Sequence, residues 1–181
     1  GIICYHALTT IRPYHINISE DDLTKSSLKS VYERAFTEQE LFVLTGMLNS
    51  IPFDFLMRTK VDTNISRYKF DESPIPRLTA GDDWFQYISQ RAAKLNCYGE
   101  PFEDMRERLG GLKPVLDENK RKTIQAEIDA AAFHAYGLTR EEAEFILDDF
   151  HTVSNPRVMT EDYFEKVFQK YITLEKEGPL P

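Results

Sequence analysis

Cysteines, glycine-rich motifs and long apolar runs are scarce in this sequence of 181 residues, and each scarcity excludes a class of protein. Cys4 and Cys97 are too few and too far apart for a disulfide framework, and neither lies in a zinc-ligand spacing. No apolar run approaches the ~20 residues that span a bilayer. The start of the chain lacks the basic region and cleavage site of a signal peptide. We therefore expect a cytoplasmic, reducing location and no membrane partner.

Basic residues are also in the minority, with 22 Lys and Arg against 30 Asp and Glu and a formal net charge of -8. This balance argues against a free-standing, non-specific nucleic-acid binder, whose affinity comes from cations that neutralise phosphates. Any nucleic-acid contact must use a local basic patch or charge elsewhere in a longer protein. The missing initiator Met and the Pro-ended tail lead us to expect that the chain is a piece of such a protein.

The apolar pattern predicts an α+β, mostly helical fold, in which a small strand-containing part is followed by a helical, bundle-like part. In the first third, β-branched and aromatic residues predict strands at 2–8 and 14–18, and helical spacing predicts a helix at 27–36. The segment 74–81, rich in Pro, is the best boundary. The predicted division is therefore 1–78, mixed α/β, and 79–181, helical.

Caps and breakers delimit the predicted helices. Thr37 and Glu40 form a capping box, and Pro52 makes that helix kink or restart. The stretch 61–70 is expected to be an exposed loop or a short strand. Gly137 ends the longest helix, Thr139 opens another with a second capping box, and Thr160 opens the last. The helices expected beyond residue 79 span about 84–95, 102–109, 117–136, 140–150 and 160 onward.

Catalytic motifs are missing. The sequence has no Gly-rich phosphate loop, no nucleophile motif, and no Asp/Asn-Pro-Pro-Tyr/Phe tetrapeptide of the kind with which methyltransferases bind an extruded adenine. The acidic run at 141–149 is best interpreted as a solvated helix face, and His134 as a core or boundary residue. We predict no catalytic, cofactor-binding or metal-binding residue in this chain.

One stretch, from residue 58 to residue 77, is locally basic, with five cations against three acidic residues. Arg and Lys pair with phosphate or guanine, and Asn pairs with adenine. Composition alone favours a polar loop after an amphipathic helix. The alternative is a DNA-contact surface made of Arg58, Lys60, Asn64, Ser66, Arg67, Tyr68, Lys69 and Arg77.

A resemblance strengthens the alternative. The Leu-Asn-Ser segment at 48–61 with its Arg-x-Lys end, the aromatic segment at 63–68 and the Pro-x-Pro exit at 73–77 resemble part of the target-recognition region of bacterial adenine-N6 DNA methyltransferases. These include fused type II restriction-modification enzymes and phage-exclusion methyltransferases. Glu-Ile-Asp-Ala at 127–130 and Tyr-Gly-Leu-Thr at 136–139 are similar to the helical tail of the same proteins, in the same order.

The resemblance implies a non-catalytic fragment that recognises duplex DNA and supports the methyltransferase domain of the same parent chain. S-adenosylmethionine would bind to that other domain. It also implies that Arg58→Ala and Lys60→Ala weaken DNA binding and leave the fold intact. Two other interpretations stay open: a helical protein-interaction or docking module without DNA contact, which a contiguous exposed apolar patch would favour, and a small independent enzyme, which would need a pocket with convergent titratable groups.

Overall fold

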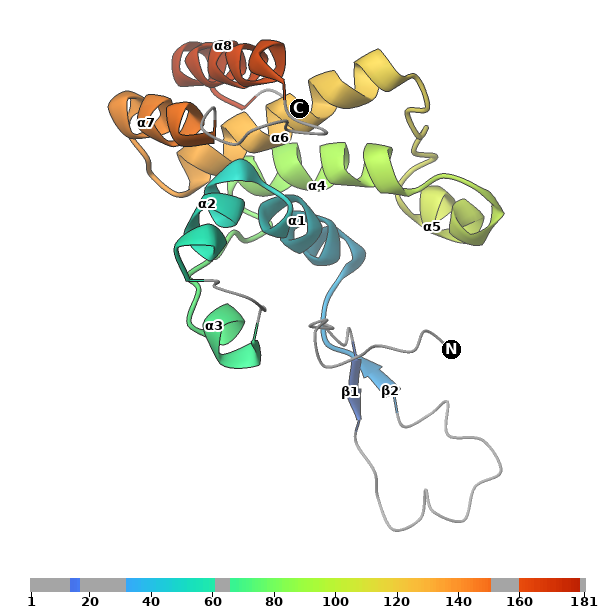
Figure 1. Cartoon of the computed structure of the whole chain (residues 1–181). Coiled ribbons are helices and arrows are strands. Elements are labelled where there is room, and N and C mark those ends of the chain that lie inside the picture. The colour runs from blue at the N-terminus through green and yellow to red at the C-terminus, as the bar shows by residue number, and fades with distance from the viewer. Residues whose placement is uncertain (1–13, 17–31, 61–65, 151–159, 180–181) are drawn as a thin grey trace, which may run out of the picture.

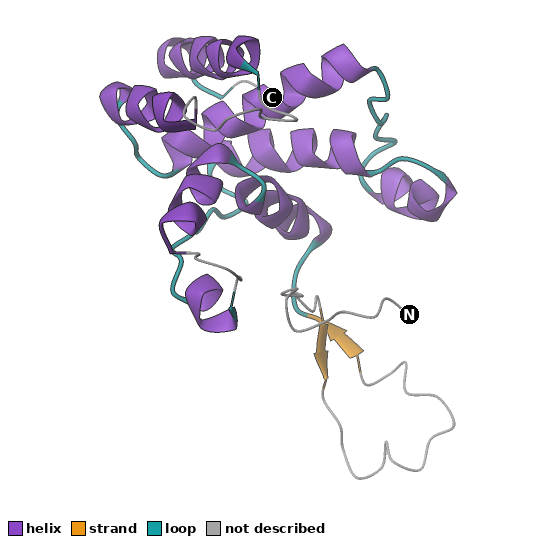
Figure 2. Ribbon diagram, in the orientation of Figure 1, coloured by secondary structure: helices purple, strands orange, loops and turns teal. Residues whose placement is uncertain are grey.

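The computed structural model of the chain describes residues 14–16, 32–60, 66–150 and 160–179. This part is mostly helical with one short antiparallel strand pair, which confirms the predicted α+β, mostly helical class (Figure 2). The elements are β1 (Tyr14–Ile16), β2 (Tyr32–Arg34), α1 (Glu38–Leu48), α2 (Ile51–Lys60), α3 (Arg67–Asp71), α4 (Asp83–Asn96), the 3-10 helix η3 (Glu100–Phe102), α5 (Glu103–Arg108), α6 (Glu118–Ala135), α7 (Arg140–Phe150) and α8 (Glu161–Glu177).

Helix α6 is the centre of the helical body (Figure 1). It packs against α4 and α8 and also contacts α1 and α2, and α1 lies along α4. The side chains from Ala130 to Phe133 are therefore buried all round the helix. A single core joins residues from α1 to α8, on both sides of the predicted boundary at 74–81.

The predicted helix boundaries follow from their caps. Glu40 N–H donates to the Thr37 hydroxyl at 3.2 Å while the Glu40 carboxylate accepts from Thr37 N–H at 2.7 Å, so the capping box is confirmed. Glu142 and Thr139 form the second one in the same way. Gly137 has φ 69°, the left-handed conformation that lets the chain leave α6.

The breaks in the first helical pair also have a local cause. Pro52 cannot donate to a carbonyl one turn earlier, so α1 ends at Leu48 and α2 starts at Ile51, with Pro52 in its first turn. None of the described helices is by itself long and apolar enough to cross a membrane. Taken together, α1 and α2, which are bent by 59° at their junction, reach the length and apolar composition of a membrane span, and this rests on length and composition only.

Two predictions of local structure are wrong. The helix expected at 27–36 is contradicted at Tyr32–Arg34, which is strand β2 and pairs with β1, as the register Tyr14 to Arg34 and Ile16 to Tyr32 shows. In so short a stretch the helical spacing of apolar residues is a weak preference, and the hydrogen bonds that the partner strand provides outweigh it. The strand predicted at 14–18 is confirmed at Tyr14–Ile16, while 2–8 and 27–31 lie outside the described residues.

The second error is the loop or strand expected at 61–70, because Arg67–Asp71 forms α3. This helix gains support from elsewhere in the chain. The Phe70 ring meets the Phe53 ring edge-on with centroids 5.9 Å apart, and Ser73 Oγ donates to the Lys69 carbonyl at 2.7 Å to close the helix end. These contacts override the weak local preference. Segment 74–78 is not helical, as its prolines predict.

Candidate functional site

The predicted DNA-contact residues occupy three connected elements. Arg58 and Lys60 lie in the last turn of α2, Ser66 to Lys69 open α3, and Arg77 lies in the irregular segment that leads to α4. Asn64 lies outside the described residues. Figure 1 shows α3 below α2, on the side of the helical body away from α8.

The two cations of α2 have internal partners. Arg58 donates to the Asp54 carboxylate from Nε at 3.0 Å and from Nη2 at 2.8 Å, and its guanidinium lies 4.2 Å from the centroid of the Phe150 ring. Lys60 Nζ donates to the Glu72 carbonyl at 2.9 Å and to Ser73 Oγ at 3.2 Å. Arg58 therefore joins α2 to α7, while Lys60 fixes the chain that leaves α3.

Helix α3 presents its side chains to solvent. None of its residues is buried, and Arg67 and Tyr68 are 89% and 61% exposed. Arg67 Nε lies 3.3 Å from an Asp71 carboxylate oxygen, an exposed ion pair of the kind that contributes little to stability. Ser66 precedes the helix, and its hydroxyl is buried without a hydrogen-bond partner.

The exit from α3 is anchored to the body of the protein. Tyr136 donates its hydroxyl proton to the Pro74 carbonyl at 3.1 Å, and Ile75 and Leu78 pack against the core. Arg77 is exposed between these two apolar side chains. Arg58, Arg67 and Arg77 are thus exposed, and the last two are carried on a short helix and a loop that the core holds in place.

A second site was not foreseen from the sequence. It is a cavity of about 350 Å³ between the carboxyl-terminal halves of α1 and α4, the first half of α6, and Tyr163 of α8. Asp129 lies at its inner end, where one carboxylate oxygen accepts from Ile51 N–H at 2.8 Å and the other accepts from the Tyr163 hydroxyl. The only sequence signal was a charged residue within the otherwise apolar run at 128–133.

Burial controls the electrostatics at the inner end of this cavity. It raises the pKa of Asp129 to about 6, since the hydrogen bonds from Tyr163 and from the Ile51 backbone only partly offset the loss of hydration, and the nearby Asp54 raises the pKa further. The pKa of the Tyr163 hydroxyl is also raised, by burial and by Asp129. Tyr163 is therefore a hydrogen-bond donor to Asp129 at neutral pH.

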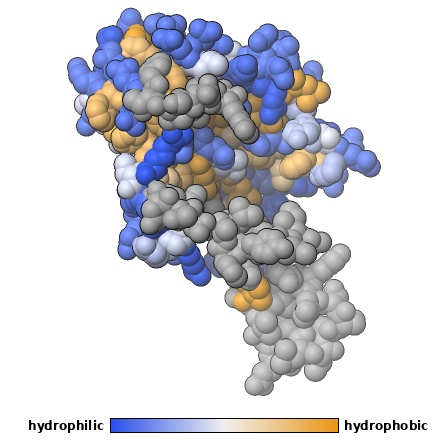
Figure 3. All heavy atoms as spheres, viewed as in Figure 1, coloured by the Kyte–Doolittle hydropathy of each residue, from blue (hydrophilic) through white to orange (hydrophobic). Residues whose placement is uncertain are grey.

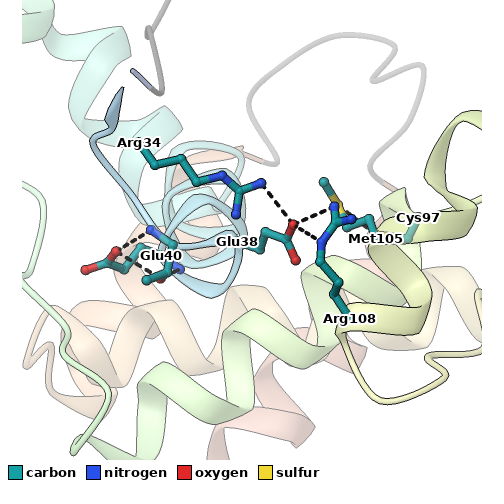
Figure 4. Close-up of polar contacts among 7 residues, drawn as sticks. Arg34, Glu38, Glu40, Cys97, Met105 and Arg108 are labelled. Atoms are coloured by element: carbon teal, nitrogen blue, oxygen red, sulfur yellow. Dashed lines mark hydrogen bonds and ion pairs between the residues drawn. The ribbon is translucent and has the colours of Figure 1, made fainter. Parts of the chain in front are cut away.

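Other charged clusters are structural. Glu38 accepts from Arg34 at 3.1 Å and from Arg108 at 2.8 Å, which ties β2 and α5 to the start of α1 (Figure 4). Burial raises the pKa of Glu38, but the two arginines outweigh it and hold that pKa below its ordinary value. Cys97 is buried with a raised pKa, so it is not a reactive thiol.

His134 and the acidic run at 141–149 have structural or solvent-facing positions in the described structure. His134 is a boundary residue as predicted, with its ring stacked between Trp84 and Tyr171 at centroid distances of 5.1 and 4.1 Å. The exposed carboxylates of α7 form a solvated helix face, also as predicted. Among residues 14–16, 32–60, 66–150 and 160–179, no group of three or more His, Cys, Asp or Glu is placed to hold a metal ion.

Comparison with models of protein families, with curated proteins and with solved structures finds no match for this chain.

Proposed function

We propose that the chain is the target-recognition and carboxy-terminal part of an adenine-N6 DNA methyltransferase, of the restriction-modification or phage-exclusion type. In this proposal α3 and the loop that follows it contact duplex DNA, and the helical body braces them and docks onto the methyltransferase domain of the parent chain. That other domain binds S-adenosylmethionine and transfers the methyl group. The resemblance of segments 48–77 and 127–139 to such proteins supports the family.

The observation that carries the DNA-contact part is the way α3 is presented. A five-residue helix has too few internal hydrogen bonds to persist alone in water, yet this one is held by Phe53, Lys60 and Ser73. None of its own side chains is fully buried, and Arg67 and Tyr68 are exposed. A supported helix with exposed charged side chains is suited to meeting a partner surface, and the space-filling view shows hydrophilic and near-neutral residues at this place (Figure 3).

Two cations provide the expected phosphate contacts. Among the described residues Arg67 pairs with Asp71 alone, in a weak surface pair that a phosphate can replace, and Arg77 is exposed. Arg58 is less suited, because it already has a two-bond pair with Asp54 and lies over Phe150. Two phosphate contacts give weak binding with a slope of only about 2 in log K against log salt, so in this proposal most of the affinity of the whole enzyme comes from the parent protein.

The experiment is fluorescence anisotropy of a labelled mixed-sequence duplex across a salt series, with the wild type and an Arg67→Ala/Arg77→Ala variant. We expect the variant to bind at least tenfold more weakly at low salt. The slope of log K against log salt should decrease by about 2, one unit for each lost phosphate contact. Lys113→Ala/Lys166→Ala is the matched control, because it removes two exposed cations from other parts of the surface.

The Lys113→Ala/Lys166→Ala control shows whether a loss of DNA binding is specific to Arg67 and Arg77. Equal weakening by the control variant would mean that the binding reflects total charge, and no binding by the wild type at low salt would contradict the proposal. Lys60→Ala is expected to act through the fold, since it removes two hydrogen bonds that fix the chain where it leaves α3. We expect it to lower the free energy of unfolding, so its effect on DNA binding would be indirect.

A second candidate function is docking onto a protein without DNA contact. The observation that favours it is Phe145 of α7, which is 65% exposed and meets the ring of Phe55 edge-on at 6.4 Å. Phe145 thus extends the half-buried Phe55 into solvent, and exposed aromatic side chains are enriched at protein-contact surfaces. The anisotropy assay separates the two candidates, because a docking module alone shows no salt-dependent binding of duplex DNA.

A further inference from the structure

The cavity beside Asp129 is unusual in the direction of its hydrogen bonds. Thr45 Oγ1 donates to the Leu41 carbonyl at 2.7 Å, and the Nδ2 groups of Asn49 and Asn96 donate to the Thr45 and Ala92 carbonyls, each at 2.8 Å. Tyr163 donates to Asp129. Each of these four groups lines the cavity and commits one proton to the protein, so their oxygen lone pairs and the second N–H of each amide remain for a ligand.

Helix ends add to this acceptor character. Asn49 is the carboxyl-terminal cap of α1, and Asn96 is the last residue of α4, so both helices direct the negative ends of their dipoles toward the cavity. The helix ends and these oxygens therefore favour a ligand that carries amino groups, and ring nitrogens of the same ligand can accept from the second N–H of Asn49 and Asn96. A ligand with carbonyl oxygens alone would face unpaired acceptors, which is unfavourable in a partly buried site.

The floor of the cavity is apolar and closely packed. Gly46, Ala92, Leu95 and Ile128 line it. A Cβ atom on Gly46 would lie 2.6 Å from Cγ2 of Ile88 and 3.4 Å from Cγ2 of Ile128, so the bare glycine is what lets α1 approach α4 this closely. A flat ring can lie against such a floor with its edge toward the acceptors.

Two cations lie at the mouth. Arg121 donates from Nη1 to the Leu95 and Val115 carbonyls, both at 2.8 Å, which fixes the guanidinium and leaves Nε and Nη2 for another acceptor. Lys122 follows it and is exposed, and Gln125 lies one turn further along α6. An anionic group on the ligand would therefore stay at the mouth while the donor-bearing ring lies inside.

We infer that this cavity binds a single nucleotide whose base carries an exocyclic amino group, with the base on the apolar floor, its amino group toward Asn49, Asn96 and Tyr163, and its phosphate at Arg121 and Lys122. The volume fits a mononucleotide, whereas an amino acid would leave most of it to water. If the nucleotide is part of a DNA strand, the inference rests on the proposed function. In that case an unpaired base could enter the cavity while α3 holds the neighbouring duplex.

The same chemistry can come from two sources, a free mononucleotide or an unpaired nucleotide in a nucleic-acid strand. Calorimetry with AMP, UMP and a single-stranded DNA 12-mer carrying one adenine among thymines distinguishes them. We expect AMP to bind at least tenfold more tightly than UMP, since uracil has a carbonyl where adenine has the amino group. Tighter binding of the 12-mer than of AMP, with competition between them, would identify the strand as the source. Binding of AMP alone would identify a free nucleotide.

Gln125→Phe tests the location. Gln125 is exposed at the mouth, so the larger ring should block entry without disturbing the core, and Gln169→Phe makes the same change at an exposed position of α8. We expect Gln125→Phe to weaken binding at least tenfold and Gln169→Phe to leave it unchanged. No binding of AMP or the 12-mer, equal affinity for AMP and UMP, or binding that survives Gln125→Phe would overturn the inference.

The test is independent of the duplex experiment. Arg67→Ala/Arg77→Ala should weaken binding of the paired duplex and leave AMP binding unchanged, while Gln125→Phe should do the reverse. Failure of the cavity proposal would therefore leave duplex recognition by α3 standing. A failure of duplex recognition would likewise leave the affinity for a free nucleotide to be decided by calorimetry.

Discussion

The buried carboxyl of Asp129 should make the stability of this protein depend on pH in an uncommon direction. Its pKa in the folded protein is raised from the ordinary value of 3.8 to about 6. Between these values the folded protein keeps a proton that the unfolded chain has released, so the contribution of Asp129 to stability falls as the pH rises through this window. The shift is equivalent to about 3 kcal/mol across the whole window, of which roughly 2 kcal/mol fall between pH 4.5 and pH 7.

Asp129→Asn isolates this effect. The amide keeps an oxygen that can accept from Ile51 N–H or Tyr163, but it does not titrate. We expect the free energy of unfolding of the variant, relative to the wild type, to increase by roughly 2 kcal/mol between pH 4.5 and pH 7. Groups with lowered pKa, such as Glu127, act in the opposite direction in both proteins, and their effect cancels in the difference.

Urea unfolding followed by tryptophan fluorescence measures the difference directly. Trp84 is the only tryptophan of the chain, and its ring stacks on His134 and meets Tyr87 edge-on, so its emission reports the packed core. Asp148→Asn, at an exposed position of α7, is the control that removes one carboxylate without altering the core. A wild-type to Asp129→Asn difference that stays constant from pH 4.5 to pH 7 would refute the reasoning from burial.

Two further predictions concern packing and are checked by urea unfolding at pH 7. Glu127→Ala removes the carboxylate that accepts from Arg91 at 2.9 Å and from Lys170 at 2.7 Å. We expect the protein to be destabilised by about 3 kcal/mol, because two partly buried cations lose their partner. A loss of stability below about 1 kcal/mol would mean that water replaces the carboxylate. Gly46→Ala places a methyl group 2.6 Å from Ile88 Cγ2. We expect this variant to destabilise the protein by about 1 to 2 kcal/mol, despite the better helix propensity of Ala. A stabilised variant would show that α1 moves away from α4 without strain.

Local signals in the sequence account for the helix boundaries. The capping boxes at Thr37 and Thr139, the stop at Gly137 and the restart at Pro52 each act within about five residues, and each is found where the sequence places it. The same holds for Asp117, which begins α6 by accepting from Lys120 N–H at 2.9 Å. Hydrogen bonds of this range depend on residue type and spacing alone, so no knowledge of the fold is needed.

The sites depend on contacts between distant segments, which the sequence does not display. Asp129 accepts from Ile51 N–H, 78 residues away, and only the packing of α2 on α6 brings them together. Lys60 looks like a free cation in the sequence, yet it is bound to a carbonyl 12 positions later. Helix α3 likewise needs Phe53 to hold Phe70. Each case is a residue whose role is set by its tertiary partner.

Charge distribution also bears on the proposed function, because a chain with net charge -8 needs a locally less acidic face to approach DNA. The exposed face of α7 carries Glu141, Glu144 and Asp148, and α7 lies on the other side of α2 from α3 (Figure 1). A duplex that approaches α7 meets carboxylates, whereas one that approaches α3 meets Arg67 and its weak surface pair. The acidic composition would then help to orient a bound duplex, since it disfavours an approach by way of α7.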